Sequence, residues 1–252
     1  LMGLFFSALA QKDTLRLWEY TRAAFEITPQ HPQILNALYA QTLEKKEWIQ
    51  ALDTLSLQLR LGFVTPDQGR INRAKVFLNQ AQEALAQGQT RDALLASEQA
   101  FDVNPCAQSA RILVPLLLTF DHPKRAKKAL RSVLSLNFDP LLFDELVRLE
   151  GLTTPAQRFS LMEELATQSS PIAHDYLQAL IKEGIACHLW GQTKQYLSLY
   201  KEVFGENAFF SIATAQLIFK ESGDSKSALS AYEKALPFFM DQSATSKKEQ
   251  KN

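Results

Sequence analysis

The residue types that most often do chemistry in proteins are sparse in this sequence of 252 residues, and they do not converge. The four histidines are His31, His122, His174 and His188. No His-x-x-x-His or Cys-x-x-Cys pair supplies the ligand spacing of a metal site. Cys187 and His188 are adjacent, but neighbouring helical positions point about 100° apart and cannot share one ion. We therefore predict that the chain has no metal site and no bound cofactor.

Haem capture and acid–base catalysis also lack their sequence signatures. A Cys-Pro haem motif requires that order of residues, whereas this chain has Pro105-Cys106. Carboxylates are paired at Asp144-Glu145 and Glu163-Glu164, but on helices such pairs usually form a solvated face, and no nucleophile accompanies them. No Gly-x-Gly-x-x-Gly dinucleotide fingerprint occurs. We predict that the protein has no catalytic residues and is not an enzyme.

Composition favours a neutral globular protein. With 27 basic and 27 acidic residues the chain has no net field to attract nucleic acid or an anionic membrane, and 46% hydrophobic residues are ample for a core. Two cysteines cannot form a disulfide framework. The longest apolar runs, Leu1–Ala10 and Ile112–Phe120, are far shorter than the roughly 20 residues of a membrane helix. We expect the given chain to be soluble and to bind no nucleic acid.

Apolar spacing predicts that the fold is all-α. Ala, Leu, Gln, Lys and Glu dominate windows with apolar residues three and four positions apart, and strict alternation is rare. Prolines that stop or start helices divide the chain into helices of about a dozen residues. These breaks fall at Thr28-Pro29, Asn104-Pro105, Asp139-Pro140, Thr154-Pro155 and Ser170-Pro171.

A repeat with a period close to 34 residues runs along the chain. Gly223, Ala228, Tyr232 and Ala235 are spaced 5, 4 and 3 residues apart, and the same spacings recur from Gly88 to Ala100, with Pro105 following. One small residue after each expected turn marks each unit, and the markers are Leu17, Ala51, Ala93, Ala126, Ala156, Thr193 and Ala228. Their intervals are 34, 42, 33, 30, 37 and 35 residues. The long interval indicates an insertion near residues 61–72, either a long loop or an extra turn.

These spacings resemble the tetratricopeptide repeat, in which small residues let two antiparallel helices approach closely. The resemblance implies an all-α, tetratricopeptide-like right-handed superhelix of antiparallel helix pairs, an α-solenoid. We expect about seven degenerate repeats over residues 1–240 and a disordered polar tail over 241–252. Pro115 lies inside an expected first helix, where it disfavours regular stacking.

A narrower resemblance covers nearly the whole chain. The ordered segments MGLFFSALAQKD, HPQILNALYAQTLEKKEWIQAL, GRINRAKVFLNQA, DALLASEQAFDVNP and HLWGQTKQYL resemble the C-terminal repeat region of the HemY-like inner-membrane proteins of proteobacteria. That resemblance implies a repeat region anchored by two N-terminal membrane helices, on the cytoplasmic face of the inner membrane. It also implies an association with haem (tetrapyrrole) biosynthesis. It does not imply the flavin-dependent protoporphyrinogen oxidase that shares the name.

A solenoid of this kind offers a concave face lined by the first helix of each pair, suited to an extended peptide or a helix of another protein. In register with the markers, the predicted binding residues are Asn36, Ala40, Lys75, Leu78, Gln82 and Arg111. A solvated groove without a ligand at these residues is an equal alternative. The leading functional hypothesis is a non-catalytic scaffold that binds proteins, among them enzymes of tetrapyrrole synthesis. The alternatives are a porphyrin- or haem-binding carrier and an adaptor of envelope assembly unrelated to haem.

The first helix carries an apolar face. Leu1, Leu4, Phe5 and Leu9 share one side with Ala8, although a terminal repeat normally has a polar outer surface. We expect further helices upstream in a longer protein, and self-association of the given chain through this patch.

Overall fold

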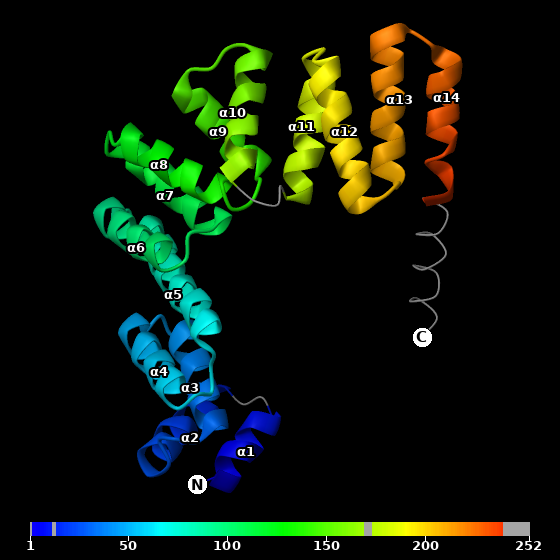
Figure 1. Ribbon diagram of the computed structural model, residues 1–252. Coiled ribbons are helices and arrows are strands. Elements are labelled where there is room, and N and C mark those ends of the chain that lie inside the picture. Colours follow the sequence, from blue (N-terminus) through cyan, green and yellow to red (C-terminus); the bar gives the residue numbers. More distant parts are fainter. Residues whose placement is uncertain (1, 12–13, 169–172, 239–252) are drawn as a thin grey trace. The chain divides into compact units, whose positions relative to one another are not determined.

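The computed structural model describes residues 2–11, 14–168 and 173–238, and every regular element in these ranges is a helix. The helices are α1 (Met2–Gln11), α2 (Thr14–Ile27), α3 (Pro32–Glu44), α4 (Trp48–Arg60), α5 (Pro66–Ala86), α6 (Thr90–Val103), α7 (Ala107–Thr119), α8 (Pro123–Leu134), α9 (Pro140–Glu150), α10 (Pro155–Gln168), α11 (His174–Ala186), α12 (Trp190–Phe204), α13 (Ala208–Ser222) and α14 (Ser225–Glu233) (Figure 1). The predicted all-α fold is confirmed. The predicted break at Ser170-Pro171 and the predicted tail over 241–252 lie outside the described residues.

Proline and capping side chains set several helix boundaries. Pro140 and Pro155 are the first residues of α9 and α10, as predicted. The Asp139 carboxylate accepts hydrogen bonds from the backbone N–H groups of Leu141 and Leu142, which satisfies two donors that a helix start leaves unpaired. The local sequence therefore supplies both the cap and the first residue of α9.

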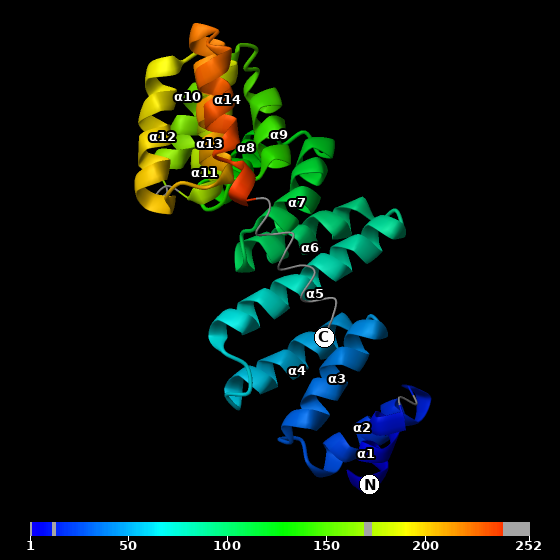
Figure 2. The same ribbon diagram turned by 90° about the vertical axis from the view of Figure 1, so that its right-hand side faces the viewer.

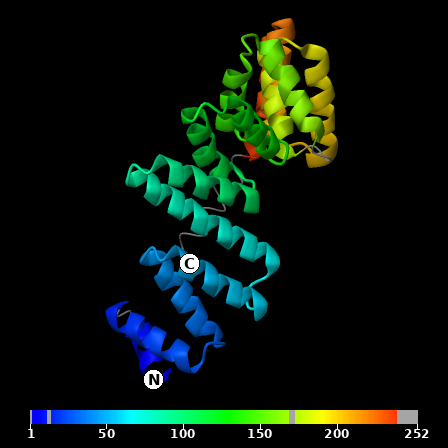
Figure 3. The ribbon, with the colours of Figure 1, turned by 90° about the vertical axis from the view of Figure 1, so that its left-hand side faces the viewer.

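The chain divides into two compact units, Leu1–Ala129 and Leu130–Asn252. Within each unit consecutive helices pack in pairs, for example α5 with α6 (Figure 3) and α13 with α14 (Figures 1 and 2). First helices of successive pairs also contact each other, α5 with α7 and α11 with α13. This is the stacking of antiparallel helix pairs that the sequence predicted.

The predicted repeat register is visible in the backbone. Five residues before six of the seven markers, the turn between paired helices has a positive φ, at Lys46, Gly88, Asp121, Gly151, His188 and Gly223. In the sixth repeat this turn does not lie at Trp190-Gly191, although a glycine is present there. Those residues begin α12, and the turn residue is His188 with φ 58°.

Small residues occupy most of the close helix crossings. Ala51, Ala93, Ala126, Thr193 and Ala228 are buried. The marker Ala156 was placed wrongly, because its side chain is exposed and Phe159, about one turn later, is the first buried residue of α10. Leu17, the first marker, is half-buried and packs against the cluster of Phe5, Ala24 and Ile34.

One crossing is so close that it requires glycine. An added Cβ on Gly184 of α11 would lie 2.4 Å from the Oγ1 of Thr193 in α12. Thr193 Oγ1 itself donates to the carbonyl of Leu189 at 2.8 Å, so the hydroxyl is satisfied inside its own helix. Threonine at a marker position is therefore compatible with the fold because its partner helix carries no side chain at that point.

The insertion predicted near residues 61–72 is accommodated by helix rather than by a long loop. α4 ends at Arg60 and α5 begins at Pro66, where Thr65 Oγ1 accepts from the N–H of Gln68 at 3.3 Å. α5 then extends for 21 residues. Of the two forms left open by the sequence, the structure shows additional helical turns.

Pro115 does not break its helix. α7 continues from Ala107 to Thr119 with Pro115 inside it, and the ring lies on the exposed side.

The predicted apolar face of α1 is only partly uncovered. Phe5 and Ala8 are buried, whereas Leu4 is exposed. The side chains of Leu1 and Leu9 lie outside the described residues. None of the described helices is long and apolar enough to span a bilayer.

Candidate partner-binding groove

The binding residues predicted from sequence all lie on first helices of pairs in the N-terminal unit. Asn36 and Ala40 are on α3, Lys75 and Gln82 are on α5, and all four side chains are exposed. The Asn36 Oδ1 accepts a hydrogen bond from Gln58 Nε2 at 2.8 Å, so this amide is used inside the fold. No cavity among those described gathers these residues at one place.

The remaining two predicted binding residues, Leu78 and Arg111, differ from each other in burial. Leu78 is only 2% exposed and packs with Phe77 and Ala100 in the core of α5 and α6. Its predicted position on an open face is therefore wrong, because the 3.6-residue period turns it inward. Arg111 is exposed on α7.

The histidines and cysteines do not gather into a site. Among the residues that the structure describes, no group of three or more His, Cys, Asp or Glu side chains could hold a metal ion. Burial and the nearby carboxylate of Glu183 raise the pKa of the Cys187 thiol, which disfavours the reactive thiolate. His174 lies instead in a polar cluster with Tyr200, its Nε2 at 2.9 Å from the tyrosine oxygen.

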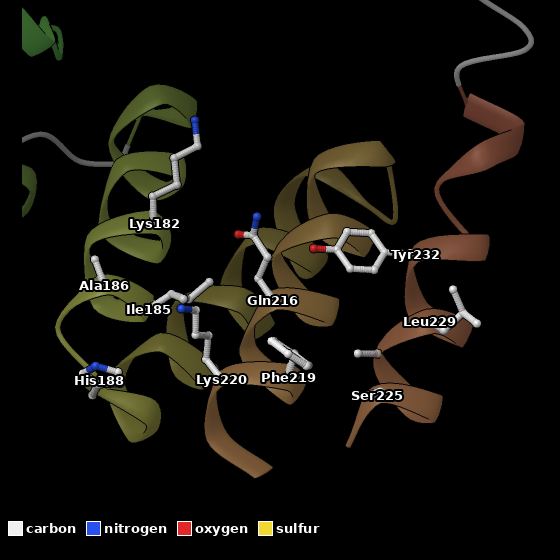
Figure 4. Close-up of a pocket in the computed structure, with 11 residues that line it drawn as sticks. Lys182, Ile185, Ala186, His188, Gln216, Phe219, Lys220, Ser225, Leu229 and Tyr232 are labelled. Atoms are coloured by element: carbon white, nitrogen blue, oxygen red, sulfur yellow. The ribbon is translucent and has the colours of Figure 1, made fainter. Parts of the chain in front are cut away.

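A groove that the sequence analysis did not predict lies in the C-terminal unit, across α11, α13 and α14 (Figure 4). We call it the α11–α14 groove. Its cavity volume is about 680 Å³. It is lined by Lys182, Ile185, Ala186 and His188 of α11 and the turn after it, by Gln216, Phe219 and Lys220 of α13, and by Ser225, Ala228, Leu229 and Tyr232 of α14.

The surface of the groove is apolar and open to solvent. Phe219 is 51% exposed, Leu229 is 60% exposed and Tyr232 is 40% exposed. In Figure 4 the Tyr232 ring extends from α14 toward Gln216 of α13, and Phe219 lies between the two lysines and α14. Three large exposed side chains that line one cavity are the kind of apolar surface that marks an interaction site.

The polar groups of the groove are basic or neutral. Lys182 and Lys220 contribute ammonium groups, His188 adds a group that is positive when protonated, and no carboxylate lines the cavity. The second hollow of this unit, of about 440 Å³, shares Lys182 but contains Asp144, Asp175 and Glu183. The two hollows therefore differ in charge although they adjoin the same helix.

The walls of the groove are held by packing behind it. Ile185 belongs both to the groove and to the core cluster that joins α11, α12 and α13. Tyr200 is fully buried in the same cluster, and its oxygen accepts a hydrogen bond from Asn207 Nδ2 at 3.0 Å. These contacts fix α11 relative to α13, so the cavity is preformed.

The start of α14 is fixed by its cap. The Asp224 carboxylate accepts from the backbone N–H groups of Lys226 and Ser227 at 3.1 and 3.2 Å. Hydrogen bonds from the side chain and backbone of Ser227 lower the pKa of Asp224. The GDS sequence before α14 thus positions the helix that carries Leu229 and Tyr232.

One sequence signal could have located this groove. In the stretch from Gly223 to Leu236 the small residues Ala228, Ala231 and Ala235 form the buried side of α14 and the residues after it. Leu229 and Tyr232 lie outside that buried side, so α14 carries more large apolar residues than its packing in the repeat buries. Excess apolar residues outside the buried stripe indicate a second contact surface.

Comparison with solved structures finds distant similarities. The chain is similar to the solved structure of a tetratricopeptide repeat protein from Parabacteroides merdae, at 13% identity and a TM-score of 0.37, covering 94% of this chain and 91% of that one. It is also similar to Pseudomonas aeruginosa pilF, at 17% identity and a TM-score of 0.26, covering 96% and 95%. No family model and no curated protein sequence matches. Neither structural likeness assigns a function to this chain.

Proposed function

We propose that this chain is a non-catalytic scaffold that binds a segment of another protein in the α11–α14 groove. One observation carries the proposal: Phe219, Leu229 and Tyr232 are exposed together around a preformed cavity of about 680 Å³. Desolvating such side chains contributes most of the binding energy in groove recognition, because large apolar and aromatic groups act as anchors. The predicted residues of α3, α5 and α7 offer no comparable cluster.

The test uses the full chain as bait in quantitative affinity capture from its native host. The variant Leu229→Asp/Tyr232→Asp places charges in the groove and should remove the specific partners. Ile49→Asp is the matched control, because Ile49 is exposed on α4 outside the groove. Partners that are retained by the groove variant and lost with the control would overturn the proposal.

The finer part of the proposal is an association with tetrapyrrole synthesis at the cytoplasmic face of the inner membrane, through an upstream anchor. Its support is the sequence resemblance to the HemY-like proteins. Enzymes of tetrapyrrole synthesis among the captured partners would support it, whereas partners of envelope assembly alone would contradict it. For the location, a cysteine introduced at Ser246 of the full-length protein, with Cys106→Ser and Cys187→Ser, should react with an impermeant reagent only after the inner membrane is opened.

A porphyrin carrier is the second candidate, and the lining of the groove favours it. Phe219 and Tyr232 offer aromatic faces, while Lys182 and Lys220 could pair with the two propionate groups of a porphyrin. Titration of the purified chain with protoporphyrin and with haem tests this candidate by absorbance. Saturable binding at one equivalent that is weakened by Lys182→Glu/Lys220→Glu supports it, and binding that Leu229→Asp/Tyr232→Asp leaves unchanged contradicts it.

A further inference from the structure

We propose that the occupant of the α11–α14 groove is an amphipathic helix of a partner protein, with an apolar stripe flanked by carboxylates. This inference rests on the proposed function and specifies the chemistry of the partner. Two independent properties of the groove support it, the packing pattern of the repeats and the charge of the lining.

The packing pattern indicates that the occupant is helical. In each unit the second helix of a pair is covered by the first helix of the following pair, as α4 is by α5, α6 by α7, α10 by α11 and α12 by α13. In the described part of the chain no helix covers α14 in this way. The groove includes α13 and α14, the two helices that the first helix of a following pair would contact, and α11 beside them.

Equivalent positions on the second helices also differ in burial between α14 and the other repeats. Four residues after five of the seven markers the side chains are buried, at Thr21, Leu55, Ser97, Leu130 and Leu197, whereas Ser160, four residues after the misplaced marker Ala156, is exposed. The equivalent residue of the last repeat is Tyr232, which is 40% exposed. A tyrosine at this position would be buried by a helix packed against α13 and α14, with its hydroxyl near the polar rim.

The charge of the lining indicates that the helix carries carboxylates beside its apolar stripe. In Figure 4, Lys182 of α11 and Lys220 of α13 both lie on the α11 side of Phe219. Among the described residues neither ammonium has a carboxylate within ion-pair distance, although Lys182 Nζ lies 5.6 Å from the centre of the Phe209 ring. A partner carboxylate near each lysine would form an ion pair, and a basic helix would be repelled.

Two other occupants fit the charge poorly. A second copy bound groove to groove would bring Lys182 and Lys220 toward like charges. The segment 239–252 has three lysines against two carboxylates, and its large apolar residues are confined to Phe239 and Met240, so it is not net acidic and has no apolar stripe at helical spacing. A helix from another protein satisfies both requirements.

Fluorescence anisotropy with three synthetic peptides of about 18 residues tests the inference. The first is a helix with a Leu/Phe stripe flanked by Glu, the second has Lys in place of Glu, and the third is the Glu peptide with a proline at its centre. The acidic helix should bind the full chain at least about tenfold more tightly than either of the others at low salt, and added salt should reduce the difference.

Charge reversal sharpens this test. Lys182→Glu/Lys220→Glu should reverse the preference toward the Lys peptide. The control Lys128→Glu, at an exposed position of α8 in the other unit, should leave the preference unchanged. Four results would overturn the inference. They are equal binding of the Glu and Lys peptides, tighter binding of the proline peptide, absence of peptide binding, and dimerisation that Tyr232→Asp abolishes.

The inference and the proposed function can fail separately. If Leu229→Asp/Tyr232→Asp still removes native partners while peptide charge has no effect, the proposed function stands and the acidic-helix inference fails. If this variant removes no partner, the proposed function fails.

Discussion

The first-helix face of the N-terminal unit and the α11–α14 groove of the C-terminal unit are built from the same repeat, yet they present different surfaces. On α3 and α5 the outward residues Asn36, Lys75 and Gln82 are polar, while the large apolar Leu78 is turned into the core. In the groove, Phe219 and Leu229 remain exposed. The difference teaches that an outward-facing first helix need not present apolar groups, because packing can turn them into the core. The groove, where apolar groups stay exposed, is therefore where we propose the binding site.

The largest effect is expected at a shared crossing position. Ala93 is fully buried where α6 packs on its neighbours, so Ala93→Asp buries an unpaired charge and should destabilise the N-terminal unit by about 3 kcal/mol or more. Gln99→Asp, on the exposed side of the same helix, should change the free energy of unfolding by less than about 1 kcal/mol. Urea unfolding measures both, and equal midpoints would refute the repeat register.

A second pair of substitutions compares equivalent positions directly. Leu197→Ala removes a buried side chain from the cluster of α11, α12 and α13 and should cost about 2 to 5 kcal/mol. Tyr232→Ala, four residues after its own marker, should cost less than about 1 kcal/mol because the ring is largely uncovered. Thermal unfolding in the absence of partners measures the difference. A larger loss for Tyr232→Ala would show that the groove is a closed core.

The crossing of α11 and α12 should be sensitive to one methyl group. Gly184→Ala places a Cβ against Thr193 Oγ1, and overpacking of this kind should cost about 1 to 3 kcal/mol. Thr193→Ala in the same chain should recover most of that loss. Gly191→Ala, where an added Cβ meets nothing within 4 Å, is the control and should be neutral or stabilising. Additive effects of Gly184→Ala and Thr193→Ala would contradict the close contact.

At two equivalent turns, adding and removing a glycine should change the free energy of unfolding in opposite directions. Asp121 has φ 56° at the same place where Gly88 has φ 74°, and a left-handed backbone disfavours most side chains by roughly 1 kcal/mol. Asp121→Gly should therefore raise the free energy of unfolding by up to about 1 kcal/mol, and Gly88→Ala should lower it by a similar amount. Destabilisation by both substitutions would contradict the equivalence of the two turns.

The smallest expected effect is the pH dependence of the α14 cap. Because hydrogen bonds from Ser227 lower the pKa of Asp224 in the folded protein, the cap contributes stability above the unfolded pKa of Asp and loses it as the pH falls through the folded value. The protection factors of the backbone amides at the start of α14, which correct the exchange rates for their intrinsic pH dependence, should fall in acid in the native chain. Asp224→Asn should remove this pH response, and an unchanged response would assign it to another group.

The fold was largely predictable because short stretches of sequence determine where the helices begin and end and how they pair. Proline positions, small residues and five-residue offsets from turn to marker specify helices and their pairing within one or two repeats, and Asp139-Pro140 shows how completely a boundary can be local. The marker Ala156 was wrong because a periodic pattern cannot tell which of two neighbouring turns of α10 faces the core, and Phe159 fills that place. The groove was missed because exposure depends on which helix covers α14, and this is a tertiary property.

Photo-crosslinking in living cells tests the docking site most directly. A photoreactive phenylalanine analogue is placed at Tyr232 in the α11–α14 groove or, as the control, at the exposed position Ile49 on α4. The account predicts a discrete crosslink to a partner protein from position 232, absent from position 49 and lost when Leu229→Asp is added. Equal crosslinking from both positions, or none from position 232, would contradict the assignment of this groove as the partner-binding site.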